Sequence, residues 1–173
     1  MPLNVEIKAR CEDHGAVRRA LESVGARREG LDHQVDTYFR VPSGRFKLRE
    51  GRIENSLIYY RRDNREGPKR SEVTLARVDP ASGLGPALRA GLEVLVVVDK
   101  QREIWFADNV KLHLDDVVGL GRFVEIEAID RDGSLGEVRL REQCEHFMDL
   151  LGIREGDLVD RSYSDLLLEI SLR

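Results

Sequence analysis

One stretch of the chain, Leu120–Asp130, places two carboxylates on the same face of an expected β-strand. Successive side chains of an extended strand point to opposite faces, so Glu125 and Glu127 share one side while Val124 and Ile126 share the other. The β-branched residues around the two glutamates favour a strand. A charged face of this kind needs either solvent or partners of opposite charge, and this choice constrains the whole fold.

The same alternation of apolar and charged residues recurs along the chain and predicts a set of strands. These expected strands are Leu3–Arg10, His33–Val41, Arg45–Glu50, Ser56–Asp63, Ser71–Val78, Val94–Phe106, Val110–Val117 and Arg122–Asp130. Turns and loops rich in Gly, Pro, Asn and Asp are expected between them, including Pro42–Gly44, Gly51–Asn55, Asn64–Pro68 and Asp79–Gly85. About eight antiparallel strands with a few helices predict an α+β fold whose sheet is curled or closed.

Four helices are expected outside the strands. The third has a distinct start, because Ser134 followed by Glu137 matches the pattern of a capping box. The expected ranges are His14 to Gly25 with Asp13 as N-cap, Pro86–Leu92, Ser134 to Gly152, and Ser164–Ile170. Composition does not change across the loop Asp79–Gly85, so residues 1–173 are interpreted as one domain.

The composition excludes several classes of protein. Charged residues make up 35% of the chain, but both signs are mixed and the net charge is only −4, which argues against a general nucleic-acid binder. The longest apolar run, Val94–Val98, is far too short to span a membrane, and the N-terminus lacks the pattern of a signal peptide. Cys11 and Cys144 are isolated and are interpreted as free thiols of a reducing compartment, which predicts a cytoplasmic location.

Lysine occurs at only five positions, and four of these lie inside expected strands with a charged or polar partner two residues away. The pairs are Glu6 with Lys8, Lys47 with Arg49, Lys100 with Arg102, and Lys111 with His113 followed by Asp115. Taken one strand at a time, such pairs are most simply solvated faces. Taken together, long cations occur on most strands while carboxylates gather at Glu6, Asp115, Glu125 and Glu127, so a closed sheet would collect both groups in one interior.

Such an interior would be strongly repulsive unless an anion occupied its cationic side and a cation its acidic side. Arginine binds phosphate through two hydrogen bonds and lysine supplies a compact charge. Carboxylates without cysteine or clustered histidine suit Mg²⁺ or Mn²⁺ rather than zinc. Phe123, Trp105 and Phe106 are expected mainly in the core, and His113 is the histidine placed on a charged strand face. The residues therefore predict a polyphosphate site with a divalent metal.

The run Asn4–Lys8 resembles the Glu-x-Glu-x-Lys signature of the CYTH superfamily, also called triphosphate tunnel metalloenzymes. Further matches follow in the order of that family, at Gln34–Phe39, Phe46–Arg49, Ile58–Arg62, Lys100–Arg102, Leu114–Val117 and Gly121–Glu127. The closing run Ser162–Leu167 resembles the class IV adenylate cyclase branch. The resemblance covers nearly the whole chain, and its specificity lies in the ordered set rather than in any one motif.

The resemblance implies an antiparallel eight-stranded closed β-barrel, a triphosphate tunnel, with flanking helices. It implies metal ligation by Glu6, Glu125, Glu127 and Asp115. It implies triphosphate binding by Lys8, Lys47, Arg49, Arg62, Lys100, Arg102 and Lys111, among which Lys8, Lys47, Arg49, Lys100 and Arg102 would act in catalysis. Asn4 departs from the signature, because an amide stands where the family has its first glutamate, and this puts a second metal site in doubt.

The expected function is metal-dependent phosphoryl transfer on a small-molecule triphosphate, with Mg²⁺ or Mn²⁺ as cofactor. Members of the family that the chain resembles hydrolyse inorganic triphosphate, thiamine triphosphate or RNA 5′ ends, or convert ATP to cyclic AMP and pyrophosphate. Hydrolysis makes the simpler demand on the site, and class IV adenylate cyclase activity is the alternative. Two further alternatives are a non-catalytic polyphosphate or nucleotide sensor and a plain barrel with solvated charges. No membrane or nucleic-acid partner is expected, and the chain is expected to be a monomer or a homodimer.

Overall fold

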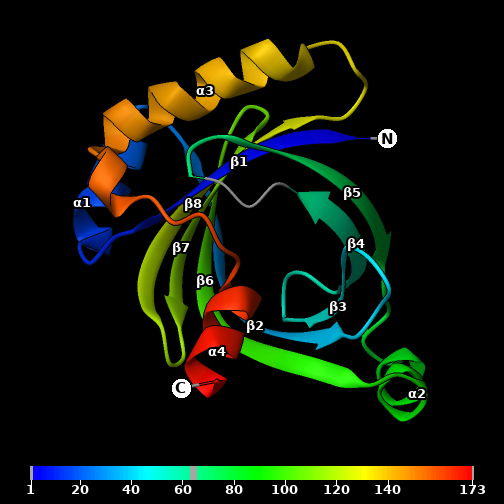
Figure 1. Ribbon diagram of the computed structural model, residues 1–173. Helices are drawn as coiled ribbons and strands as arrows, with labels where there is room; N and C mark the ends of the chain where they lie inside the picture. The colour runs from blue at the N-terminus through cyan, green and yellow to red at the C-terminus, as the bar shows by residue number, and fades with distance from the viewer. Residues whose placement is uncertain (1, 63–65, 173) are drawn as a thin grey trace.

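Eight antiparallel strands form a closed ring in the computed structural model, which describes residues 2–62 and 66–172, with only the backbone of Arg62 (Figure 1). Around the ring the order is β1-β5-β4-β3-β2-β6-β7-β8, and β8 pairs back onto β1. The strands are β1 (Leu3–Arg10), β2 (Arg27–Phe39), β3 (Arg45–Glu50), β4 (Ser56–Arg62), β5 (Lys69–Arg77), β6 (Val94–Ala107), β7 (Val110–Val117) and β8 (Gly121–Asp130). The prediction of an eight-stranded closed antiparallel barrel is confirmed.

Two strands begin earlier than expected. β2 begins at Arg27 instead of His33, because its first residues pair with the distant end of β6, where Arg27 lies opposite Phe106. β5 begins at Lys69 instead of Ser71, because Lys69 pairs with Glu6 of β1. Both extensions depend on partners far along the chain, which the local alternation of residues does not reveal.

The helices are α1 (His14–Ser23), α2 (Leu84–Gly91), α3 (Gly136–Leu151) and α4 (Tyr163–Ser171), with a short 3₁₀ turn at Glu155–Asp157. Asp13 caps α1 as predicted, since its side chain accepts a hydrogen bond from the amide of Ala16. α4 begins at Tyr163 instead of Ser164, and Ser162 caps it by accepting a hydrogen bond from the amide of Asp165. Cys11 and Cys144 are free thiols.

The predicted capping box at Ser134 and Glu137 is wrong. α3 begins at Gly136, and its N-cap position makes no side-chain hydrogen bond. Asp130, buried at the end of β8, instead accepts hydrogen bonds from the amides of Gly133, Leu135 and Gly136 at 2.9, 3.2 and 2.9 Å. A carboxylate from the preceding strand thus satisfies amides at the start of α3, in place of the side chain of Ser134.

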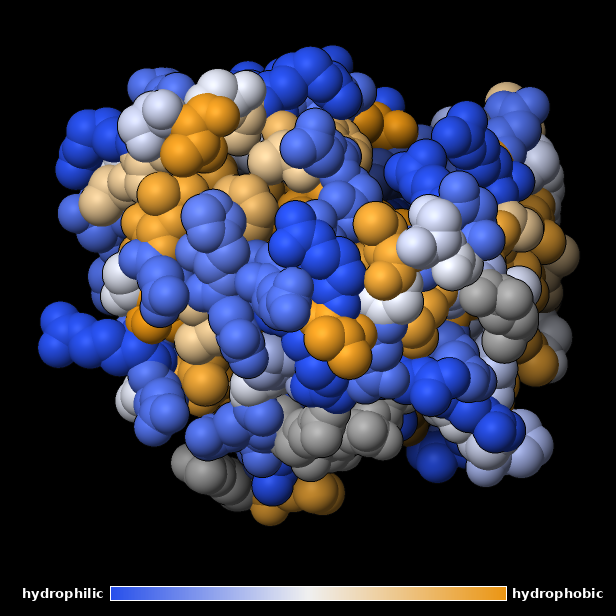
Figure 2. All heavy atoms as spheres, turned by 90° about the horizontal axis from the view of Figure 1, so that it is seen from above, coloured by the Kyte–Doolittle hydropathy of each residue, from blue (hydrophilic) through white to orange (hydrophobic). Residues whose placement is uncertain are grey.

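The main apolar core lies outside the ring, not inside it. Val5 and Ile7 of β1, Leu112 of β7 and Ile126 of β8 pack with Leu140 of α3, and α1 and α3 cover these strands (Figure 1). Because side chains alternate along a strand, the charged residues of the same strands must face the interior. The face seen in Figure 2 is mostly hydrophilic with smaller apolar patches, so the charged interior is additional to a polar surface on this face.

One end of the ring is covered by the chain that follows α3. Leu158 forms a bridge with Ala9, the amide of Val159 bonds to the carbonyl of Lys8, and α4 then continues across the strand ends (Figure 1). Tyr163 at the start of α4 packs against Tyr38 and Phe123 inside this end. The opposite end opens into a wider hollow of about 880 Å³, whose lining includes Ile53, Leu75 and Phe106. Among the described residues no helix is long and apolar enough to cross a membrane.

Candidate functional site

The interior of the ring holds a cavity of about 140 Å³ that is lined by charged side chains from the strands. Nine of the predicted site residues line it, namely Glu6, Lys8, Lys47, Arg49, Lys100, Arg102, Lys111, Glu125 and Glu127. Lys8, Lys47, Arg49, Lys100 and Arg102 are each less than 9% exposed. The alternative of a plain barrel with solvated charges is therefore wrong for these residues. The predicted contact of Arg62 lies outside the described side chains.

The acidic wall comes from the pairing of β1 with β8. Glu6 lies directly opposite Glu127 in this ladder, and Lys8 lies opposite Glu125. The Nζ atom of Lys8 lies 3.5 Å from Glu125, and the Nη2 atom of Arg102 lies equally close to it. Burial raises the pKa of Glu125, but these two cations outweigh it and hold the pKa well below its usual range. Glu125 is therefore a charged carboxylate at neutral pH.

Glu127 has a different environment. Burial raises its pKa, and the nearby carboxylates of Glu6 and Glu125 raise it further, while Lys111 opposes them. Glu127 accepts a hydrogen bond from the side-chain amide nitrogen of Asn4 at 2.7 Å. Among the residues that the structure describes, the Oδ1 atom of Asn4 is buried without a hydrogen-bond partner. A buried acceptor of this kind is costly unless something outside the protein meets it.

These features fit a divalent cation. Glu6, Glu125 and Glu127 supply carboxylate oxygens, and Asn4 can supply the amide oxygen that lacks a partner. Oxygen-only ligands suit hard divalent ions. A bound cation would also relieve the repulsion that raises the pKa of Glu127.

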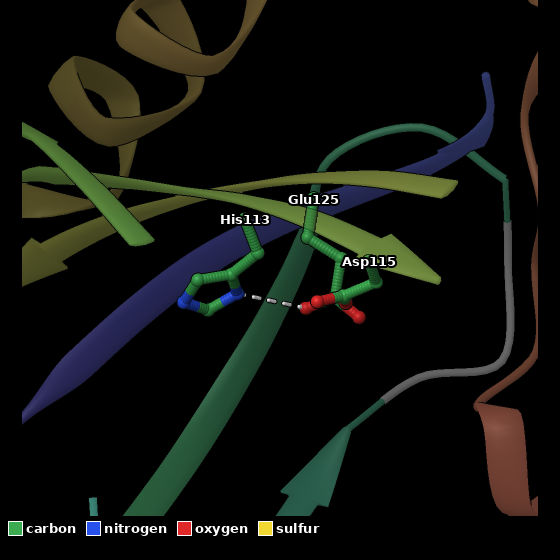
Figure 3. A group of neighbouring side chains, drawn as sticks. All are labelled: His113, Asp115 and Glu125. Carbon is green, nitrogen blue, oxygen red and sulfur yellow. Dashed lines mark hydrogen bonds and ion pairs between the residues drawn. The ribbon is translucent and has the colours of Figure 1, made fainter. Parts of the chain in front are cut away.

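Asp115 lies close to this group but is already engaged. Its oxygens accept hydrogen bonds from Nε and Nη2 of Arg102 at 2.7 and 2.8 Å, and from the hydroxyl of Tyr163 at 2.7 Å. Ligand atoms of His113, Asp115 and Glu125 lie within 4.8 Å of one another (Figure 3). Because three donors occupy the Asp115 oxygens, the contacts favour holding Arg102 in place over ligating a metal.

His113 is buried beside Glu125, with its Nδ1 atom 3.3 Å from Oε2 of that carboxylate (Figure 3). Burial, together with the charge of Arg102, lowers the pKa of His113 to about 4, so the imidazole is neutral at pH 7. Nδ1–H then donates to Glu125, and Nε2 is left as a buried acceptor with no partner in the described part of the chain. The position of His113 between Lys111 and Asp115, on the charged face of an expected strand, was the sequence signal for this residue.

The cationic wall converges on one carboxylate that sequence reasoning did not single out. Asp36 on β2 accepts from Lys47 at 3.0 Å, from Arg49 at 2.8 and 2.9 Å, and from Lys100 at 2.8 Å. Burial opposes the ionisation of Asp36, but its three cationic partners hold its pKa well below the usual range. The one available signal was the alternation of Asp36 with Tyr38, which places both on one strand face.

Lys100 is almost fully buried within this wall. Burial lowers its pKa to about 7, and the charges of Arg49, Arg102 and Lys47 act in the same direction, while Asp36 opposes them. The carboxylate of Asp36 is shared among three cations, so it does not fully compensate Lys100. A second anion in the cavity would do so.

A second missed carboxylate, Glu54, lies in the loop between β3 and β4. It bonds to Lys111, accepts from Gln34 at 2.8 Å and lies 3.5 Å from Arg49. The loop backbone is held by the buried carboxylate of Asp32, which accepts hydrogen bonds from the amides of residues 52, 53 and 54 at 2.6 to 3.0 Å. A loop glutamate carries no strand periodicity, so the sequence offered no signal for it.

Two lysines contact the segment that covers one end of the ring. The Nζ atom of Lys69 donates to the carbonyls of Val159 and Asp160 at 3.3 and 2.6 Å, and that of Lys8 to the carbonyl of Arg161 at 3.4 Å. Lys8 also lies 3.9 Å above the ring of Tyr163. Lys69 is not among the predicted site residues, because it follows the breaker Gly67–Pro68 and precedes the expected strand Ser71–Val78.

Eight antiparallel strands around an interior with an acidic and a cationic wall define a tunnel protein. Residues 2–163 match the model of the CYTH domain, and the chain belongs to that family. The family resemblance seen in the sequence is thereby confirmed.

Similar proteins occur in archaea, bacteria and plants. A protein of Methanocaldococcus jannaschii, provisionally named an adenylate cyclase, is 25% identical over 95% of this chain and 98% of its own. The structure of a Vibrio parahaemolyticus protein with the same provisional name has a TM-score of 0.75 at 22% identity, and covers 96% of this chain and 98% of its own. A Hippeastrum protein is provisionally named an adenylyl cyclase and described as having a dominant triphosphatase activity. Its structure has a TM-score of 0.63 at 14% identity, and the match covers 100% of this chain and 97% of its own.

Proposed function

We propose that this protein is a divalent-metal-dependent enzyme that hydrolyses a triphosphate compound inside the tunnel. The observation that carries the proposal is that three interior carboxylates gather on two paired strands while three cations gather around another carboxylate in the same cavity. Glu6, Glu125 and Glu127 come from β1 and β8, whereas Lys47, Arg49 and Lys100 gather around Asp36. A phosphate chain with a divalent cation satisfies both sets at once.

The chain's own residues take distinct roles in this proposal. Glu6, Glu125 and Glu127, with the oxygen of Asn4, would hold Mg²⁺ or Mn²⁺, which when bound neutralises and orients phosphate oxygens. Lys8, Lys47, Arg49, Lys100, Arg102 and Lys111 bind the phosphates and stabilise the charge that builds up on the transferred group. Asp115 and Tyr163 keep the guanidinium of Arg102 oriented toward Glu125 and the cavity.

Adenylate cyclase activity is the second candidate. The relatives that carry that name favour it, and so does the run Ser162–Leu167 of this chain, which resembles the class IV adenylate cyclase branch. In hydrolysis a water molecule attacks the terminal phosphorus, whereas in cyclisation the ribose 3′-hydroxyl attacks the α-phosphorus and pyrophosphate leaves. Both reactions use the same charged walls. A sensor that binds without turnover is the non-catalytic alternative, and the amide at Asn4 is the feature that favours it.

Product analysis separates these functions. With Mg²⁺ or Mn²⁺, we expect release of orthophosphate from tripolyphosphate, and from ATP or thiamine triphosphate where the organic group fits the mouth. The assay combines phosphate detection with chromatography of the nucleotide products. Cyclic AMP with pyrophosphate would identify the cyclase instead. Tight binding of tripolyphosphate without any product would support the sensor and contradict the enzymatic proposal.

The affinity for tripolyphosphate should depend on pH through Lys100. The free protein has a Lys100 pKa of about 7, and a bound anion raises it, so binding takes up a proton above pH 7. Affinity is then greatest below pH 7 and falls as the pH rises toward the pKa of the bound state. Calorimetry in buffers of different ionisation enthalpy measures the proton uptake. Lys100→Met should remove this uptake, while the ionisation of tripolyphosphate itself contributes equally to both proteins; equal uptake by both would contradict the assignment.

A further inference from the structure

Each interior cation whose side chain the structure describes already has a partner within the protein. Lys47 and Lys100 bond to Asp36, Arg102 to Asp115, and Lys111 to Glu54. Arg49 is shared between Asp36 and Glu54, Lys8 lies beside Glu125, and Lys69 donates to backbone carbonyls. An incoming polyphosphate can therefore gain full contact with this wall only where a protein carboxylate gives way.

The carboxylates differ in their freedom to move. Asp36 and Asp115 are carried by strands, have short side chains, and are 1% and 0% exposed. Asp36 accepts hydrogen bonds from three cationic side chains, and Asp115 accepts them from Arg102 and Tyr163. Glu54 is carried by the loop between β3 and β4, has a longer side chain, and is 23% exposed. It lines both the inner cavity and the wider hollow at the open end. Glu54 is thus the interior carboxylate that can turn outward without disturbing a strand.

The contacts of the loop between β3 and β4 allow the side chain of Glu54 to move while the loop backbone stays in place. The carboxylate of Asp32 binds three consecutive loop amides, and the side chain of Asn55 bonds to both the amide and the carbonyl of Gly51. These contacts fix residues 51–55 without using the carboxylate of Glu54. The Glu54 side chain is then free to exchange its partners, since Gln34, Arg49 and Lys111 are all contacts of the carboxylate alone.

We propose that Glu54 is an internal competing anion, which occupies Lys111 and Arg49 in the free protein and is displaced by a phosphate group at the mouth of the tunnel. This inference rests on the proposed function and names a residue that sets its specificity. A phosphate group with two charges can replace a single carboxylate at these cations. Chloride, a monatomic ion with one charge and no pair of oxygens to bridge them, cannot. Glu54 therefore excludes common monovalent anions and weakens the hold on phosphate products.

The test is calorimetric binding of tripolyphosphate to the metal-free protein, with wild type compared to Glu54→Gln. The variant should bind about tenfold tighter or more, since a charge-assisted contact no longer has to be broken. At constant ionic strength, replacing gluconate by chloride should weaken binding to the variant and leave wild type nearly unchanged. Glu50→Gln is the matched control, because Glu50 lies four residues before Glu54 in the sequence and pairs with Arg89 on the surface. It should behave as wild type in both measurements.

The outcomes separate this inference from the proposed function. Absence of tripolyphosphate binding in wild type and variant alike, in the presence of Mn²⁺ as well as without it, would overturn the proposed function. Binding by wild type with no gain, or with a loss, in Glu54→Gln would overturn only the role of Glu54. Should Glu54→Gln fail to fold, Glu54→Asp makes the same comparison, because it keeps the charge but loses the reach to Lys111. It should also bind tripolyphosphate more tightly than wild type.

Discussion

Glutamine in place of Glu125 or Glu127 is expected to weaken the binding of Mn²⁺ by about a hundredfold or more, and to reduce metal-dependent phosphate release in proportion. A neutral amide then replaces a carboxylate at a buried site, where the attraction between a divalent ion and a single charge amounts to several kcal/mol. Glu127 faces Glu6 across the β1–β8 ladder, and burial raises the pKa of Glu127, with the carboxylates of Glu6 and Glu125 acting in the same direction.

Electron paramagnetic resonance of free Mn²⁺, titrated with metal-free protein and no substrate, measures this affinity independently of turnover. Glu72→Gln is the control, because Glu72 is an exposed residue of β5 that pairs with Arg70 outside the cavity. Unchanged Mn²⁺ binding in both Glu125→Gln and Glu127→Gln would refute the assignment of the acidic wall as the metal site. A loss confined to one variant would identify which carboxylate contributes most.

Asparagine in place of Asp36 is expected to lower the free energy of unfolding by about 3–5 kcal/mol, because Lys47, Arg49 and Lys100 would be left buried without their shared anion. Tripolyphosphate should then stabilise the variant more than wild type, since the ligand supplies the missing negative charge. The expected result is a large loss of stability in the free protein and partial recovery in the complex.

Chemical denaturation with and without tripolyphosphate measures both effects. Asp99→Asn serves as the comparison, since Asp99 pairs with His33 on the exposed surface and should cost little. Equal stability of Asp36→Asn and wild type, or an equal gain from the ligand in both, would show that Asp36 does not balance the cationic wall.

The alternation of residues was sufficient to predict the closed sheet and most of the charged interior. Glu6, Lys8, Lys47, Lys100 and Glu127 all recur at a spacing of two within strands, and the ring turns all of them inward. This period is local, so it can be recognised without knowing which strands pair.

The rest of the site depends on partners that are distant in the sequence. Asp36 acquires its role only because β3 and β6 flank β2, and these bring in Lys47 and Lys100. Glu54 follows no strand period and is placed by Asp32, which lies twenty-two residues earlier. Asp130 likewise takes the capping role expected of Ser134. In each case a buried carboxylate is satisfied by groups that the local pattern does not identify.

The pairing of β1 with β8 joins the beginning of the chain to a strand more than a hundred residues later, and it is this pairing that brings Glu6 beside Glu127. The proposed ligand set therefore exists only in a chain whose sheet has closed. Binding of a divalent ion would add its free energy to closure of the ring, because an open sheet holds the same carboxylates apart. The ion would then cross-link β1 and β8. Metal depletion should therefore open the pairing of β1 with β8 before that of any other two strands.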